Sequence, residues 1–275
     1  MSSSSPGFAI VLTCLFCWPL AGWADQPIFD EMPRWSHGWG FQVVQEYRME
    51  RDLLEDGEVI GEGLGEESHI VHLQGVYTWK KWIRATVKLP YVIHAEQEII
   101  SAGGTTSTET DRGFGDAVIA LPLKSYFNLD GRSGSWTLAP QVAVPLRSPD
   151  GYSFYPHEWG SALTAGYETE TYRFHVGGSL SGWLYPGDKP SEVIAALSVG
   201  VNLSGFGSAG HLKAKSRLTT AIDGTLRWSV GPTLYWRIND TVHTQFQWKH
   251  DVVDRPQKRD HGNGEQVTAG IGFVF

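Results

Sequence analysis

Apolar and polar residues alternate along almost the whole chain, and this period of two constrains the fold more than any other feature. Between residues 37 and 49, Trp39, Phe41 and Val43 fall on one face, whereas Gly40 and Gln42 fall on the other. Such alternation is typical of a β-strand whose two faces meet different environments. Twelve segments show it, most weakly the ninth: 37–49, 71–79, 83–93, 113–128, 135–146, 158–169, 171–185, 192–204, 210–218, 225–238, 241–250 and 266–275.

The connections between these segments alternate between short and long. Short turns are expected at 80–81, 128–134, around 170, at 205–209 and at 239–240, and longer links at 50–67, 94–112, 147–157, 186–191, 219–224 and 251–263. A transmembrane barrel has this arrangement, with short turns in the periplasm and longer loops outside the cell. The sequence therefore predicts an all-β fold: a transmembrane antiparallel up-and-down β-barrel of about twelve strands over residues 37–275, in the bacterial outer membrane.

Aromatic residues lie near the strand ends, on the face that is predicted to meet lipid. Those near the short turns are Trp39, Trp79, Trp136, Tyr167, Trp236 and Phe273, and those near the long links are Trp159, Trp228 and Trp248. Two aromatic girdles at the lipid–water boundaries are typical of outer-membrane barrels. The last strand carries Ile271, Phe273 and a terminal Phe275 at alternate positions. This pattern resembles the assembly signal that the barrel-assembly machinery recognises.

The first 24 residues have the pattern of a cleaved signal peptide. An apolar run from Phe8 to Leu20 precedes Gly22 and Ala24, which are small residues at the positions that signal peptidase requires. The run is too short for a membrane-spanning helix. We therefore expect a signal peptide at 1–24, a short periplasmic segment at 25–36 and the barrel at 37–275. Both cysteines, Cys14 and Cys17, would be lost on cleavage.

The composition alone would suggest a soluble acidic protein. The net charge is −8 and the mean hydropathy is −0.22, but a barrel places only every second residue against lipid, so its mean hydropathy stays low. The chain holds 12 Trp, 10 Tyr and 12 Phe, which excludes a disordered chain because so much apolar surface can be buried. The acidic balance disfavours nucleic-acid binding.

The opposite face of the strands is predicted to line the lumen. Its charged and ionisable candidates contain more bases than acids: Glu46, Arg48, His72, Arg84, Lys88, Asp116, Lys124, Glu168, Arg173, His175, Arg227, Arg237, His243 and Lys249. A basic lumen would favour anionic or electronegative solutes. The competing interpretation is that these charges pair and plug a narrow barrel.

Residues 110–275 resemble a family of outer-membrane barrels named for the meta-pathway of phenol degradation. The resemblance rests on Gly113–Ala117 (GFGDA), Pro140–Leu146 (PQVAVPL) with the following Ser148–Gly151 (SPDG), Ser229–Asp240 (SVGPTLYWRIND) and the Gly270–Phe275 end (GIGFVF). The Ser148–Gly151 loop departs from the Pro-Thr-Gly-Asp type expected there. The resemblance implies a passive channel or transporter for small molecules, including aromatic and other hydrophobic compounds.

Two other functions remain open. Outer-membrane lipid hydrolases are barrels with a Ser–His constellation, but no nucleophile motif surrounds any serine here, and a catalytic triad is a matter of geometry. A structural or adhesive barrel with a plugged lumen is the second alternative. We expect no cofactor and no metal. The acidic link at 50–67 is expected to be a solvated loop, with divalent-cation bridging to lipopolysaccharide as the functional alternative. The expected partners are outer-membrane lipid, lipopolysaccharide, the assembly machinery and a small-molecule solute.

Overall fold

The computed structural model describes residues 37–100, 105–129, 132–148, 151–203 and 210–275. The predicted signal peptide at 1–24 and the periplasmic segment at 25–36 lie outside these residues. Within the described part of the chain, no helix has the length and hydropathy needed to cross a bilayer.

All regular structure in the described residues is β-strand. The strands are β1 (Gly38–Glu50), β2 (Asp52–Glu55), β3 (Glu58–Gly61), β4 (Glu66–Lys80), β5 (Ile83–Ile100), β6 (Thr106–Phe114), β7 (Ala117–Ala120), β8 (Leu123–Leu129), β9 (Arg132–Val144), β10 (Gly160–Thr171), β11 (Phe174–Leu184), β12 (Glu192–Asn202), β13 (Gly210–Ala221), β14 (Leu226–Arg237), β15 (Val242–Arg255), β16 (Asp260–Gly262) and β17 (Glu265–Val274).

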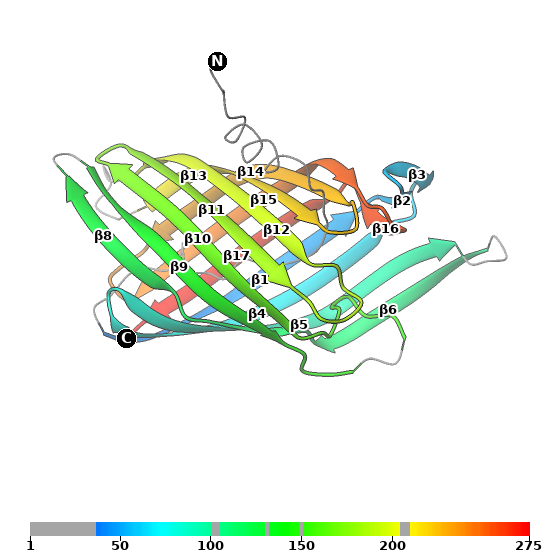
Figure 1. Cartoon of the computed structure of the whole chain (residues 1–275), viewed down its shortest axis with the longest axis horizontal. Coiled ribbons are helices and arrows are strands. Elements are labelled where there is room, and N and C mark those ends of the chain that lie inside the picture. The colour runs from blue at the N-terminus through cyan, green and yellow to red at the C-terminus, as the bar shows by residue number, and fades with distance from the viewer. Residues whose placement is uncertain (1–36, 101–104, 130–131, 149–150, 204–209) are drawn as a thin grey trace, which may run out of the picture.

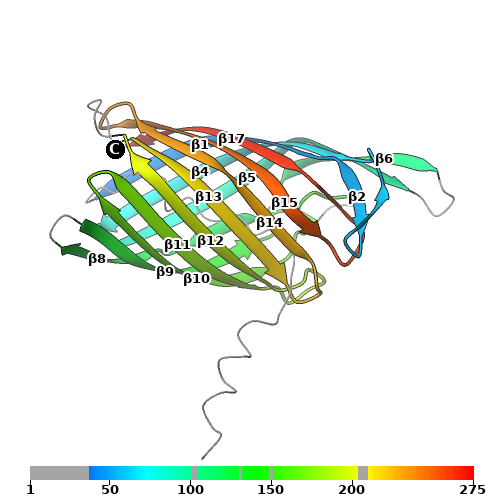
Figure 2. The ribbon, with the colours of Figure 1, turned by 90° about the horizontal axis from the view of Figure 1, so that it is seen from above.

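The main sheet closes on itself as an antiparallel barrel (Figures 1 and 2). Neighbours along the chain pair in sequence order, and closure comes from β17 against β1, where Gly40 lies opposite Val274 and Met49 opposite Glu265. Trp39 also exchanges backbone hydrogen bonds with Phe275. With β7 and β8 counted as one interrupted strand, the described residues form the predicted twelve-stranded barrel. Closure leaves no strand edge facing lipid.

One predicted strand, 113–128, is divided in the structure. Its first residues, Gly113 and Phe114, are the end of β6. Gly115 and Asp116 separate β6 from β7, and Leu121 and Pro122 separate β7 from β8. Proline has no N–H to donate to a ladder, so it interrupts the pairing. Instead the Pro122 carbonyl accepts from the Arg84 N–H, and the Leu121 N–H donates to the Pro140 carbonyl. Both halves still pair with β9, so the strand keeps its place in the barrel.

The long links lie at one end of the barrel, here called the loop end, and two of them are more ordered than the sequence predicts. Strands β5 and β6 form a hairpin that extends beyond the barrel (Figure 1), where the sequence predicts a loop at 94–112. The acidic link at 50–67 is not simply solvated. Its strands β2 and β3 form a three-stranded sheet with β16, and this sheet buries Leu53 and Leu54. Both chain ends of the barrel lie at the opposite end, called the turn end.

The outer face of the barrel is apolar, as the alternation predicts. Along β11 and β12, the outer face exposes Leu180, Val193, Leu197 and Val199. The alternate positions His175 and Ser181 of β11 are buried. Trp39 and Trp136 are 64% and 61% exposed. An exposed apolar belt on a closed sheet is stable only against lipid.

Candidate functional site

The inner wall of the barrel carries most of the predicted lumen residues. Nine of them are buried: Glu46, Arg48, His72, Arg84, Lys88, Asp116, Lys124, His175 and His243. Glu168, Arg227, Arg237 and Lys249 are partly buried. Buried polar and charged groups need partners. Arg48 and Arg227 have theirs at the loop end, Asp116 at the connection from β9 to β10, and Lys124 pairs with Glu168 in the turn-end half. Glu46 pairs with His72 across β1 and β4.

Arg173 does not lie on the inner wall. The turn between β10 and β11 comes at Tyr172 and Arg173, slightly later than the predicted position near Glu170, and both residues are exposed. The Thr171 hydroxyl accepts a hydrogen bond from the Phe174 N–H at 3.0 Å and fixes this turn. Such local side-chain bonding is a frequent device for closing a turn.

At the loop end, Arg227 of β14 joins three other segments. Its guanidinium donates to Glu50 Oε1 at 3.0 Å, to Asp254 Oδ1 at 3.0 Å and to the His261 carbonyl at 2.8 Å. Arg48 also pairs with Glu50. Because Arg227 contacts Asp254 through two nitrogens, the pair has the forked geometry that makes arginine–carboxylate bonds strong.

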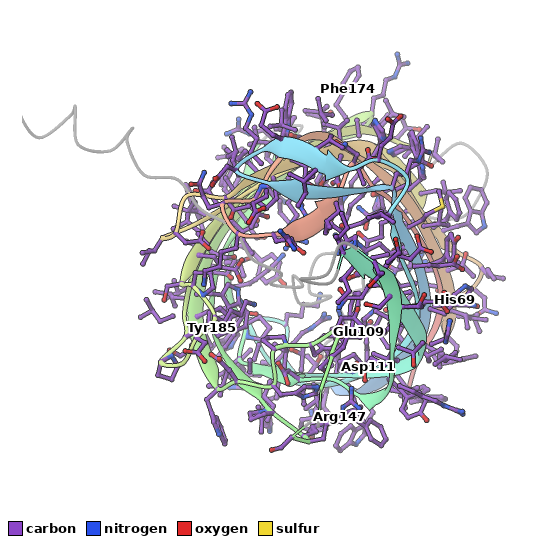
Figure 3. All side chains as sticks on the ribbon, turned by 90° about the vertical axis from the view of Figure 1, so that its right-hand side faces the viewer. His69, Glu109, Asp111, Arg147, Phe174 and Tyr185 are labelled. Atoms are coloured by element: carbon purple, nitrogen blue, oxygen red, sulfur yellow. The ribbon has the colours of Figure 1, made fainter. Side chains whose placement is uncertain are left out.

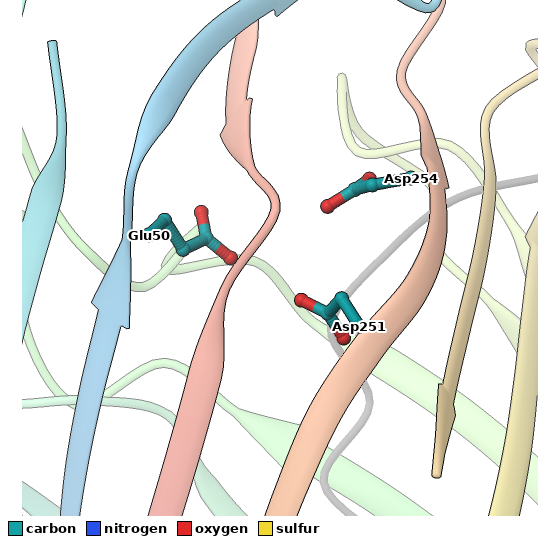
Figure 4. A group of neighbouring side chains, drawn as sticks. All are labelled: Glu50, Asp251 and Asp254. Carbon is teal, nitrogen blue, oxygen red and sulfur yellow. The ribbon is translucent and has the colours of Figure 1, made fainter. Parts of the chain in front are cut away.

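Three carboxylates of this group, on Glu50, Asp251 and Asp254, turn toward one another (Figure 4), with one oxygen of each within 4.8 Å of the others. Three such oxygens could hold a divalent cation. The Arg227 guanidinium already donates to Glu50 and Asp254, so the arrangement is accounted for as an ion-pair network and we assign no metal to it.

The connection from β9 to β10 is described at 145–148 and 151–159, which we call the β9–β10 loop, and Asp111 of β6 holds it at the inner wall. The carboxylate accepts from the Phe154 N–H at 2.9 Å and from the Ser153 hydroxyl at 3.2 Å, and it pairs with Arg147. Figure 3 shows Asp111 and Arg147 side by side at the mouth. Burial raises the pKa of Asp111, but the bonds from Arg147 and the Phe154 N–H outweigh it, so this pKa lies below its ordinary value.

The same loop carries a serine–histidine contact. His157 Nε2 lies 2.8 Å from Ser153 Oγ, and His157 Nδ1 lies 3.2 Å from Asp116 Oδ1. Burial and the nearby charge of Arg147 lower the pKa of His157. The order Ser–His–Asp is that of a hydrolytic triad, and none of this was visible in the spacing of the sequence.

In the turn-end half of the barrel, an arc of rings follows the inner wall from β11 to β15. His175 and His211 have ring centroids 6.2 Å apart, His211 and Tyr235 are stacked at 5.1 Å, and Tyr235 and His243 are 5.8 Å apart. His243 fits because it packs on Gly272, where a Cβ would lie only 2.3 Å from its ring. Nearby, Lys124 pairs with Glu168, which also accepts from Ser135 at 2.8 Å.

A cavity of about 420 Å³ lies at the loop end between the barrel wall and the β9–β10 loop. Phe154, Tyr155 and Pro156 of the loop line it, together with Arg217 of β13 and Lys249 of β15. Its volume falls within the range of about 300–1,000 Å³ that is usual for small-molecule sites. A smaller pocket of about 40 Å³ adjoins it, and both are lined by Tyr155, Pro156 and Lys189.

Several residues of this site escaped the sequence analysis because they lie in links that were predicted to be outer loops. Asp111, Ser153, Tyr155, His157 and Lys189 are examples. One signal was present: Tyr152, Phe154 and Tyr155 gather in a link where solvent exposure would predict polar residues. Gly115 is the matching small residue, because a Cβ there would lie 2.3 Å from the Tyr155 ring.

The closed barrel, its apolar outer belt and its polar inner wall define the class: the chain is a bacterial outer-membrane β-barrel. No protein-family model matches the sequence, and no curated protein matches it either.

Among solved structures, the chain is similar to an outer membrane channel from Pseudomonas putida F1. The TM-score is 0.72 at 14% sequence identity, over 92% of this chain and 100% of that one. The β domain of the Bordetella autotransporter BrkA has a TM-score of 0.44 at 12% identity, over 87% and 100% of the two chains. The monoaromatic hydrocarbon channel CymD has a TM-score of 0.40 at 8% identity, over 87% and 88%. The first likeness shows the fold, and the other two are too distant to carry an argument.

Proposed function

We propose that the chain is a passive outer-membrane channel for small molecules, with its loop end outside the cell and its turn end in the periplasm. The observation that carries this proposal is the cavity of about 420 Å³ at the loop end, which is lined by charged and aromatic side chains. A structural or adhesive barrel with a plugged lumen would not need a cavity of this size inside its wall. The similar channel from Pseudomonas putida F1 supports the proposal through its fold.

Membership of the family named for the meta-pathway of phenol degradation belongs to the same proposal. The GFGDA, PQVAVPL and SVGPTLYWRIND segments support it, and they occupy β6–β7, β9 and β14. The solutes would then include aromatic or other hydrophobic compounds. Lipopolysaccharide around the loop end and the assembly machinery acting on Ile271, Phe273 and Phe275 are the proposed partners; Phe275 is 74% exposed.

Insertion of the purified full chain into planar bilayers tests the channel. We expect discrete ion-current steps, and we expect liposomes that contain the protein to swell in small solutes. Heat-denatured protein added in the same detergent is the control. Correctly folded protein that gives neither steps nor swelling would contradict the proposal.

The plugged barrel has one observation in its favour, since Arg48, Glu50, Arg227 and Asp254 pair with one another. These pairs lie in the wall beside the cavity and leave it open, which favours the channel.

The Ser153–His157–Asp116 contact favours a lipid hydrolase as a second candidate. Two features count against it: the Ser153 hydroxyl donates to Asp111, and the adjacent Phe154 N–H, the expected oxyanion donor, also donates to Asp111. We therefore assign the contact to holding the β9–β10 loop. Phospholipid hydrolysis by the reconstituted protein that disappears in Ser153→Ala would overturn this assignment.

A further inference from the structure

Positive side chains from several strands converge on the loop-end cavity. Seven Arg or Lys residues line it against five Asp or Glu residues. Lys249 of β15 lies close enough to Arg217 of β13 and Arg48 of β1 for their charges to interact, and Lys88 of β5 interacts with Lys249 and Arg217. Four strands that are far apart in the sequence therefore direct cations toward one part of the lumen.

Bringing like charges together away from bulk water is unfavourable, because each disfavours the charged form of the others. Glu46 and Asp251 lie near Arg217 and Lys249, and Glu192 lies near Arg217. Glu46 also bonds to His72 at 2.9 Å. An anion that enters the cavity would lie near Arg217 and Lys249, and the excess of cations over carboxylates in the lining favours a negatively charged solute.

An apolar surface adjoins these cations. Tyr155 and Pro156 line both the cavity and the smaller pocket, where Trp183 and Tyr185 stand beside Lys88. The Trp183 and Tyr185 rings are stacked, with centroids 5.9 Å apart and planes at 10°. Trp183 is only 2% exposed, and Lys189 Nζ lies 4.0 Å from the centre of the Tyr185 ring, so the ring that faces the larger cavity is that of Tyr155. A flat ring of this kind favours a planar apolar body.

We propose that the loop-end cavity binds small carboxylates that carry a planar apolar group, and that it selects them over neutral and cationic molecules of the same shape. The carboxylate would lie near Arg217 and Lys249, and the ring would lie against Tyr155. This inference rests on the proposed channel and names the class of its solute.

The test uses benzoate as the probe, with benzyl alcohol and benzylamine as neutral and cationic molecules of similar shape. In planar bilayers that hold the full-length protein, we expect benzoate to block the ion current at concentrations at least tenfold below those of the other two. Arg217→Gln and Lys249→Gln should each raise the half-blocking concentration of benzoate by about tenfold, because a charge-assisted bond is lost. Lys80→Gln, at the exposed turn end of β4, is the matched control and should leave the half-blocking concentration of benzoate unchanged.

The outcomes separate this inference from the channel itself. Current steps without preferential block by benzoate would contradict the carboxylate site but not the channel. A stronger block by benzylamine than by benzoate would do the same. Folded wild-type protein that gives no current contradicts the channel. If the variants fail to fold, as judged by their mobility in unheated detergent gels, the relative block of the wild-type protein by the three probes still tests the preference for carboxylates.

Discussion

At the scale of single residues, Arg227 shows how the barrel tolerates buried charge. Its partners Glu50 and Asp254 have side chains that are 1% and 0% exposed. A buried ion pair adds little net stability over an apolar pair, but removing one partner leaves the other charge buried and uncompensated. The group therefore fixes how β1, β14 and β15 meet at the loop end.

We predict that Arg227→Gln lowers the free energy of unfolding by about 3 kcal/mol, because the buried Asp254 carboxylate loses the cation that pairs with it and Glu50 keeps only Arg48. Urea titration of the protein in lipid vesicles measures this change. Arg259→Gln is the control, since Arg259 pairs with Glu55 where both side chains are more than 40% exposed, and such pairs contribute less than about 1 kcal/mol. Equal effects of the two substitutions would contradict the importance of the network.

At the scale of elements, the β9–β10 loop forms one side of the loop-end cavity. Asp111 holds it through a backbone bond and a pair with Arg147, and Tyr155 packs over Gly115. Phe154 and Tyr155 also contact the buried cluster of Ile70, Val92 and Ala95 on β4 and β5. A connection that looks like an outer loop in the sequence is thus part of the inner wall.

We predict that Asp111→Ala releases this loop. Hydrogen exchange at the Phe154 amide should accelerate by about tenfold or more, because the amide loses a bond to a charged acceptor, and the single-channel conductance should rise. Glu109→Ala, on the same strand and bonded to Gln97 at 2.8 Å, is the control and should leave both quantities unchanged. Unaltered exchange in Asp111→Ala would show that packing alone holds the loop.

At the scale of the whole molecule, closure of the barrel and its apolar outer belt require a lipid bilayer around the protein. Leu180, near the middle of β11, is 55% exposed on the outer face. Phe174 lies on the same face at the turn end of that strand, where Figure 3 shows its side chain directed outward. The two positions therefore sample different depths of the lipid bilayer.

We predict that Leu180→Arg lowers the free energy of unfolding in lipid vesicles by about 2–4 kcal/mol, whereas Phe174→Arg lowers it by no more than about 1 kcal/mol. The cost depends on depth because an arginine near the interface can reach water. Urea titration in vesicles of uniform lipid composition measures both values. Equal costs at the two positions would contradict the assigned membrane span.

The strands could be predicted from the sequence where the alternation is local and uninterrupted. The segment 225–238 becomes β14 at Leu226–Arg237, and the weakest segment, 210–218, becomes β13 at Gly210–Ala221. Two kinds of prediction were wrong. Pro122 cannot donate to the ladder and divides a predicted strand, and the links at 50–67 and 94–112 form strands with partners that the local pattern does not identify. Of the candidate lumen residues, Arg173 lies in a turn. The bond between Thr171 and Phe174 places that turn at Tyr172 and Arg173, after the predicted position near Glu170.

The sequence by itself determined the fold class, the number of strands and the face of each strand that meets lipid, because a period of two assigns every side chain to one side of the sheet. Only the tertiary structure decided which inward charges meet. Glu50 and Arg227 are 177 residues apart and become neighbours through closure of the barrel. It also placed Tyr155 inside the lumen, gathered Arg217 and Lys249 at one cavity, and brought Lys88 to the smaller pocket that adjoins it. Such contacts depend on register and curvature across distant strands, which no local pattern records.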